Sequence, residues 1–106
     1  MGKLSLEVPH SLPPQEALQR ITALVEHWYS RYGFQKNWTD NACQLKGNFM
    51  GIQLEAEIYI LEDKVSGSAS DPGFLLRGPA HKYLSKKMAE YLNPQLSLEE
   101  ILRQDA

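Results

Sequence analysis

The chain has 106 residues, of which 42% are hydrophobic and 23% are charged, a balance typical of one globular domain. The formal net charge of −2 gives no general attraction to nucleic acid or to an anionic membrane. The composition excludes a disordered chain, and the single cysteine, Cys43, excludes an internal disulfide.

The N-terminal third predicts one strand and one long helix. Apolar and polar residues alternate from Lys3 to Val8, and Pro9 ends this strand pattern. We expect the helix to begin around Ser11 to Gln15, with Ser11 as its capping residue and prolines in its first turn. It should end at Gly33. Its buried stripe, spaced by three and four, comprises Leu18, Ile21, Leu24, Val25, Trp28, Tyr29 and Tyr32.

The middle of the chain predicts an antiparallel sheet joined by short turns. The segments concerned are 34–38, 42–49, 52–61 and 64–70. The third alternates most clearly, and its inward positions are Ile52, Leu54, Ala56, Ile58 and Ile60. The inward positions of the last segment are small, namely Val65, Gly67 and Ala69. We therefore expect the first helix to pack closely over them through Trp28 and Tyr29.

The C-terminal third predicts two helices. Phe74-Leu75-Leu76 is a short apolar segment before Gly78-Pro79, and we expect the second helix to run from Pro79 to just before Asn93-Pro94. Ser97 to Glu100 has the pattern of a capping box and predicts a short third helix. Because so short a helix is unstable alone in water, we expect it to dock on this domain or on a second copy, or else to fray.

These elements predict an α+β fold with a single domain over residues 1–94 and a short helical tail over 95–106. The domain is an antiparallel sheet of four to five strands, in the order strand-helix-strands-helix, with two helices covering one face. We predict no signal peptide and no membrane span. A lone cysteine suits a reducing compartment, so we expect a cytoplasmic location.

The sequence contains no recognised catalytic, cofactor-binding or phosphate-binding motif. We predict a protein that is not an enzyme and that uses no cofactor and no metal, because His10, His27, His81 and Cys43 lack ligand spacing. Glu55 and Glu57 point the same way from one strand and are a conceivable acid–base pair, although the solvated face of a sheet explains them as well. His10, between a strand and a helix, is either functional or a structural residue that bonds the backbone at this corner.

Two groups of residues are candidate contacts for a partner. The apolar set, which would form an interaction surface, comprises Trp38, Phe74, Leu75, Leu76, Leu98, Ile101 and Leu102. The basic set, which would meet an anionic partner, comprises Arg77, Lys82, Lys86 and Lys87. Cations on a helix also serve solubility alone, and we rank nucleic acid below the other partners.

Several motifs together carry a family resemblance. They are Leu4-Ser5-Leu6-Glu7-Val8-Pro9-His10-Ser11-Leu12, Glu16-Ala17, Tyr32-Gly33-Phe34, Trp38 and the pair Gly47 and Gly51. This set resembles the putative polyhydroxyalkanoic acid system proteins over about residues 3 to 92. The resemblance implies a small bacterial cytoplasmic protein linked to polyhydroxyalkanoate gene regions, and it brings no catalytic residue.

Three functions follow as hypotheses. The first is an accessory or interaction protein that contacts a polyhydroxyalkanoate granule surface or a granule protein through the apolar set, with the tail forming a homo-oligomer. The second is a binder of a small hydrophobic ligand, in a pocket between the strand with Val65, Gly67 and Ala69 and the helices. The third is an accessory protein that contacts nucleic acid through the basic set.

Overall fold

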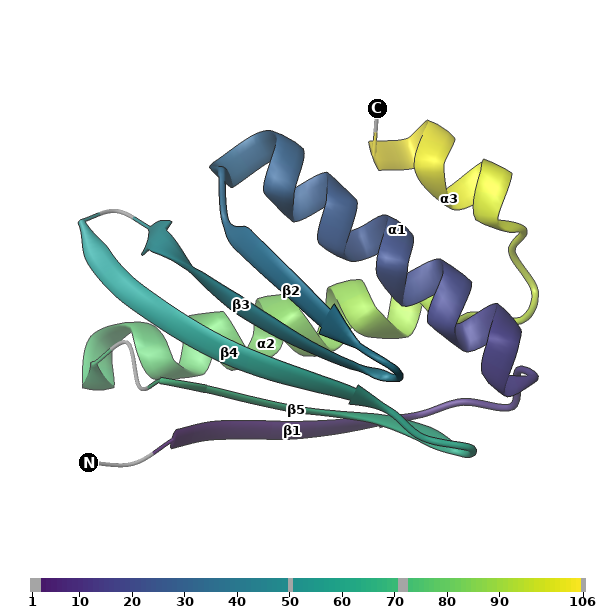
Figure 1. The fold of residues 1–106 in the computed structure, drawn as a ribbon, viewed down its shortest axis with the longest axis horizontal. Helices are drawn as coiled ribbons and strands as arrows, with labels where there is room; N and C mark the ends of the chain where they lie inside the picture. Colours follow the sequence, from purple (N-terminus) through teal and green to yellow (C-terminus); the bar gives the residue numbers. More distant parts are fainter. Residues whose placement is uncertain (1–2, 50, 71–72, 106) are drawn as a thin grey trace.

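The computed structural model describes residues 3–49, 51–70 and 73–105, and for Lys3, Phe49, Ile52, Phe74 and Asp105 it describes the backbone alone. It confirms the α+β fold, with five strands and three helices (Figure 1). The strands are β1 (Lys3–Pro9), β2 (Gln35–Thr39), β3 (Ala42–Phe49), β4 (Ile52–Ile60) and β5 (Lys64–Ser70). The helices are α1 (Pro14–Tyr32), α2 (Phe74–Tyr91) and α3 (Leu98–Asp105).

The five strands form one antiparallel sheet in the order β1-β5-β4-β3-β2. Strands β2 to β5 follow one another as a meander, and α1 crosses from one edge strand, β1, to the other, β2 (Figure 1). The short turn expected between segments 52–61 and 64–70 is confirmed at Glu62-Asp63, because the Leu61 N–H donates to the Lys64 carbonyl at 2.8 Å. Asp40 makes the turn between β2 and β3 with φ of 54°, a conformation that Asp tolerates well.

The alternation along β4 is confirmed where its side chains are described. Ile58 and Ile60 are buried in the core, whereas Glu55 and Tyr59 on the opposite face are exposed. The prediction for the Ile52 side chain lies outside the described part of the structure.

α2 packs mainly on β1, and α1 packs on β2, β3 and β4, so the two long helices together cover one face of the sheet.

Helix α1 follows its predicted stripe with two exceptions. Ile21, Leu24 and Val25 are fully buried, and Gly33 ends the helix in the left-handed region with φ of 72°. Tyr29 and Tyr32 are not buried as predicted, since 50% and 38% of their surfaces are exposed. Both close the last turn, where a ring with a polar tip can border solvent.

The predicted capping role of Ser11 is wrong. The N-cap is Pro13, which makes no side-chain hydrogen bond, and Pro14 opens the helix. Ser11 lies two residues before the cap, too far out to reach the N–H groups of the first turn. The fixed φ angles of the two prolines set the helical start instead.

The predicted start of the second helix at Pro79 is also wrong, because α2 begins at Phe74. The Leu76 and Arg77 N–H groups both donate to the Gly73 carbonyl, at 3.1 and 2.9 Å, and so form the first turn. Pro79 lies inside the helix. It removes one donor near the helix start, a loss that the remaining ladder tolerates.

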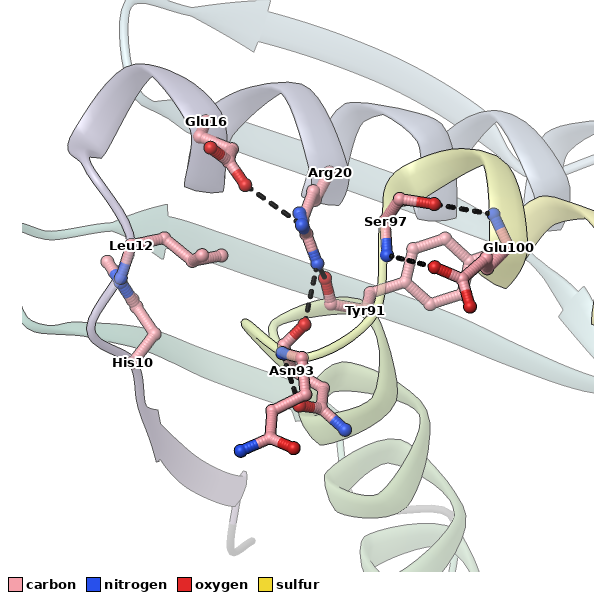
Figure 2. Close-up of polar contacts among 9 residues, drawn as sticks. His10, Leu12, Glu16, Arg20, Tyr91, Asn93, Ser97 and Glu100 are labelled. Carbon is pink, nitrogen blue, oxygen red and sulfur yellow. Dashed lines mark hydrogen bonds and ion pairs between the residues drawn. The ribbon is translucent and has the colours of Figure 1, made fainter.

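The capping box of α3 is confirmed. The Ser97 N–H donates to Glu100 Oε1 and the Glu100 N–H donates to Ser97 Oγ, both at 3.1 Å (Figure 2). Ile101 is 1% exposed and belongs to the main core. The tail therefore docks on its own domain, which is the first of the three outcomes expected for it.

Candidate functional site

A buried arginine joins the two long helices at one end of the molecule. Arg20 on α1 is 5% exposed, and its guanidinium donates to the carbonyls of Tyr91 at 3.3 Å and Asn93 at 2.8 Å (Figure 2). It also forms an ion pair with Glu16 at 2.8 Å. The carbonyls at a helix C-terminus lack intrahelical donors and carry partial negative charge, so a cation there satisfies both needs.

At the other end of the same helix pair, the packing leaves a partly open cavity of about 370 Å³. Its floor comes from the sheet, through Leu4, Leu6, Leu45, Leu54, Ala56, Ile58, Gly67 and Ala69. Its roof and sides come from Trp28, Tyr32, Phe34, Leu76, Pro79, Ala80, Tyr83, Leu84 and Met88. The roof residues Tyr32, Pro79 and Tyr83 are also exposed to solvent.

The small residues of β5 account for part of this space. We expected Trp28 and Tyr29 to pack closely over them, and the structure shows otherwise. A Cβ atom on Gly67 would meet the Glu57 carbonyl at 3.7 Å and the Leu6 side chain at 3.9 Å, so its nearest neighbours belong to the sheet and not to α1. The missing side-chain volume at Gly67 becomes cavity, and Tyr29 lies at the surface instead.

Polar groups gather at one place in the cavity wall. The Trp28 indole N–H donates to the Tyr83 hydroxyl at 3.3 Å. The pKa of Tyr83 is raised, mainly because the hydroxyl is partly buried. The hydrogen bond from Trp28 lowers this pKa, whereas the charge of Tyr32 and its hydrogen bond with Tyr83 raise it further. The Tyr83 hydroxyl is therefore neutral at physiological pH and able to donate. An apolar pocket with a few placed polar groups is typical of a small-molecule site.

A family profile matches residues 4–96, and its description is putative polyhydroxyalkanoic acid system protein. The chain belongs to this family. The matched range holds the whole sheet except the first residue of β1, together with α1, α2 and every residue that lines the cavity. It ends before α3. Searches of curated proteins and of solved structures gave no significant match.

The structure separates the members of the apolar set. Leu75 is 77% and Leu102 is 43% exposed, whereas Leu98 is half-buried and Ile101 lies in the core. Leu76 is half-buried and lines the cavity, and the Phe74 side chain lies outside the described part. Trp38 is half-buried, and its indole nitrogen has no hydrogen-bond partner among the described residues. The role of the set as an interaction surface stays a prediction.

All four members of the basic set lie on α2. Arg77, Lys82 and Lys86 are exposed and Lys87 is half-buried. Helix α2 borders the cavity through other residues, among them Leu76, Tyr83 and Leu84, and none of the four cations lines it. A contact with an anionic partner stays a prediction.

The two strand carboxylates have local partners. Glu55 pairs with Lys46 at 3.8 Å across to β3, and Glu57 accepts a hydrogen bond from the Tyr59 hydroxyl at 2.8 Å. That hydrogen bond, reinforced by the charge of Glu57, raises the pKa of Tyr59. Both carboxylates thus take part in ordinary surface interactions on the face away from the cavity.

Cys43 is fully buried on β3, and burial raises the pKa of its thiol, which disfavours the reactive thiolate.

Within residues 3–49, 51–70 and 73–105, no group of three His, Cys, Asp or Glu side chains could hold a metal ion. Across the same ranges, no helix combines the length and the apolar character needed to cross a membrane.

His10 holds the corner between β1 and α1 through its ring. The Leu12 N–H donates to Nδ1 at 3.1 Å, which assigns the proton to Nε2, and Nε2 then donates to the Leu61 carbonyl at 3.0 Å. This is the structural alternative considered from the sequence. The two hydrogen bonds tie the start of α1 to the β4–β5 hairpin.

We expect His10→Ala to destabilise the fold by about 1–2 kcal/mol, because both ring hydrogen bonds are lost. In His10→Asn, the side-chain oxygen can still accept from the N–H two residues on, so about half of that loss should be recovered. Urea unfolding of the two variants and the wild type measures both differences. Equal stability of the alanine and asparagine variants would count against the Leu12 contact.

Proposed function

We propose that this protein is a non-enzymatic, cytoplasmic accessory protein of the polyhydroxyalkanoate system that holds an aliphatic chain in the cavity between α2 and the sheet. The observation that carries the proposal is the cavity itself. Its volume of about 370 Å³ lies within the range of about 300–1,000 Å³ usual for ligand pockets.

The nature of the lining supports an aliphatic occupant. Protein cores are close-packed and rarely retain voids much larger than a water molecule, because an unfilled apolar space forfeits dispersion contacts. Leu4, Leu54, Leu76 and Leu84 would supply those contacts to a bound chain from both sides of the cavity. The hydrophobic effect would then drive binding.

The family description and the surface beside the cavity support the link to polyhydroxyalkanoate. Polyhydroxyalkanoates are aliphatic polyesters, so segments of their chains have the apolar character of the lining. Leu75, which is strongly exposed, precedes Leu76 of the cavity wall on the first turn of α2. If this turn contacted a polyester surface, a polymer chain at that surface would lie close to the cavity. The proposal thus combines the hypothesis of a granule contact with the hypothesis of a hydrophobic-ligand pocket.

The test is binding of diphenylhexatriene, a hydrocarbon dye that fluoresces when it leaves water. We expect the wild type to bind the dye and Ala69→Leu to weaken binding at least about tenfold, because the larger side chain fills the floor of the cavity. Hydroxyalkanoate oligomers should displace the dye from the wild type.

Ser66→Leu is the matched control. Ser66 lies on the same strand, and by strand alternation its side chain points to the opposite face. This variant should bind the dye like the wild type, and circular dichroism should show that both variants are folded. A wild type that ignores the dye, or equal effects of the two substitutions, would contradict the proposal.

A further inference from the structure

The solvent-facing side of α2 carries a stripe of exposed residues, which we call the outer stripe. Its members recur at spacings of four, three and four, as on one side of a helix, and they are Leu75, Pro79, Lys82 and Lys86. All four are exposed, whereas Met88 and Tyr91 on the opposite side of the helix are buried. Only Pro79 among the four also lines the cavity, so the outer stripe is a separate surface.

No acidic side chain of the helix opposes the positive charge of the outer stripe. Residues 72–89 contain four of the chain's 11 Lys and Arg residues and none of its 13 Asp and Glu residues. Within the described part of the chain, neither Lys82 nor Lys86 forms an ion pair. Four cations elsewhere are each paired with a glutamate, namely Lys36, Lys46, Lys64 and Arg103. The outer stripe is thus a local positive surface on a chain whose net charge is −2.

The exposed leucine indicates which anionic partner fits this surface. Leu75 is 77% exposed, more than any other large hydrophobic residue in the described ranges, so it gains from a partner that removes it from water. In a lipid layer, charged headgroups lie directly above aliphatic carbon, and one helix face with cations and an apolar side chain finds partners for both. A nucleic acid offers the phosphates but no aliphatic layer beneath them.

We propose that the outer stripe binds the surface of a lipid layer with anionic headgroups, with Leu75 inserted among the acyl chains and Lys82 and Lys86 against the phosphates. The apolar stem of each lysine can lie along the layer while its ammonium stays at the level of the headgroups. This inference goes beyond the proposed function, because it does not require the cavity to hold a ligand.

The experiment measures cosedimentation of the full chain with phosphatidylcholine vesicles that contain about 30% phosphatidylglycerol, in about 50 mM NaCl, where charges are weakly screened. We expect binding at least about tenfold tighter than to pure phosphatidylcholine vesicles, and most of this difference should vanish in about 0.5 M NaCl. Each lysine near an anionic layer strengthens binding by about fivefold, so Lys82→Gln/Lys86→Gln should weaken it at least about tenfold. Leu75→Ser should weaken it by about fivefold or more, because the apolar contact is lost.

Matched controls separate the outer stripe from charge and apolarity in general. Lys46→Gln/Arg103→Gln makes the same change in net charge at two other exposed cations, and Leu102→Ser makes the same apolar-to-polar change on α3. Both should bind the vesicles like the wild type, and circular dichroism should show that every variant is folded. Ala69→Leu, which fills the cavity, should also bind them like the wild type, so failure of the docking surface and failure of the cavity function are distinguishable.

Several outcomes would overturn the inference. They include equal binding to neutral and anionic vesicles, and equal effects of the outer-stripe and control substitutions. Fluorescence anisotropy with a short DNA duplex tests the other anionic partner, and duplex binding that depends on the two lysines but not on Leu75 would assign the surface to nucleic acid instead. Light scattering without lipid tests a second copy, and a mass that falls in Lys82→Gln/Lys86→Gln would assign the surface to self-association.

Discussion

Replacement of Arg20 by alanine is expected to destabilise the domain by about 3 kcal/mol and to lower its melting temperature by on the order of 10 °C. The guanidinium is almost completely buried and supplies donors to two carbonyls at the end of α2. Charge-assisted hydrogen bonds of this kind are stronger than neutral ones, and the alanine variant would lose both of them, although the Asn93 carbonyl would still accept from the Leu96 N–H at 3.2 Å. Because Glu16 is partly exposed, water can replace its share of the interaction.

Arg103→Ala is the matched control for this experiment. Arg103 forms the same type of ion pair with Glu99, four residues earlier on its helix, but both side chains are mostly exposed. Its removal should cost only a few tenths of a kcal/mol. Arg20→Lys should fall between the two alanine variants, since an ammonium keeps the charge but cannot reproduce the fork of donors. Urea unfolding gives the comparison, and similar stabilities of the Arg20→Ala and Arg103→Ala variants would contradict the role of Arg20.

The features that could be predicted from the sequence are those with a local cause. The alternation in β4 and the spacing along α1 follow from which face of each element meets the core. The capping box at Ser97 is likewise complete within four residues. In each case the physical determinant lies inside the window that the pattern covers.

The role of Arg20 could not be predicted, because its partners carry no sequence signal. It bonds backbone carbonyls that lie 71 and 73 residues away, and a carbonyl is present in every residue. One clue was available. Arg20 lies between Ala17 and Ile21 on the buried side of α1, and a charged residue on such a stripe requires a partner.

The sequence indicates where a cavity could lie, beside the small residues of β5, but not whether the space stays open, because that depends on distant parts of the chain. A run of small residues on β5 indicates either close approach of a helix or empty space, and the sequence does not distinguish the two. The outcome depends on where α2 lies, and the sequence predicts its start too late because Gly78-Pro79 resembles a helix boundary. Tertiary packing of α2 on β1 outweighs that local signal.

Gly47→Ala is expected to be the second most damaging substitution, with a cost of about 2 kcal/mol. A Cβ atom at Gly47 would lie 2.0 Å from Cδ1 and 2.7 Å from Cε1 of Phe34, so the ring must move. On one side the Phe34 ring is limited by the Tyr32 ring, whose centroid lies 5.9 Å away. On another side the Phe34 ring borders the cavity. Displacement toward the open side would place the ring in the cavity, so the same variant should also bind diphenylhexatriene more weakly.

Two further variants isolate the clash as the cause. Gly78→Ala makes the same chemical change inside α2, where an added Cβ would meet nothing within 4 Å, so it should stabilise the domain by about 0.5–1 kcal/mol through helix propensity. In the double variant Gly47→Ala/Phe34→Leu the smaller side chain can yield, and the total cost in urea unfolding should fall below the sum of the single costs by about 1 kcal/mol. Additive costs would mean that the Phe34 ring is not what the new methyl group meets, and the shape of the cavity wall at this point would then need another explanation.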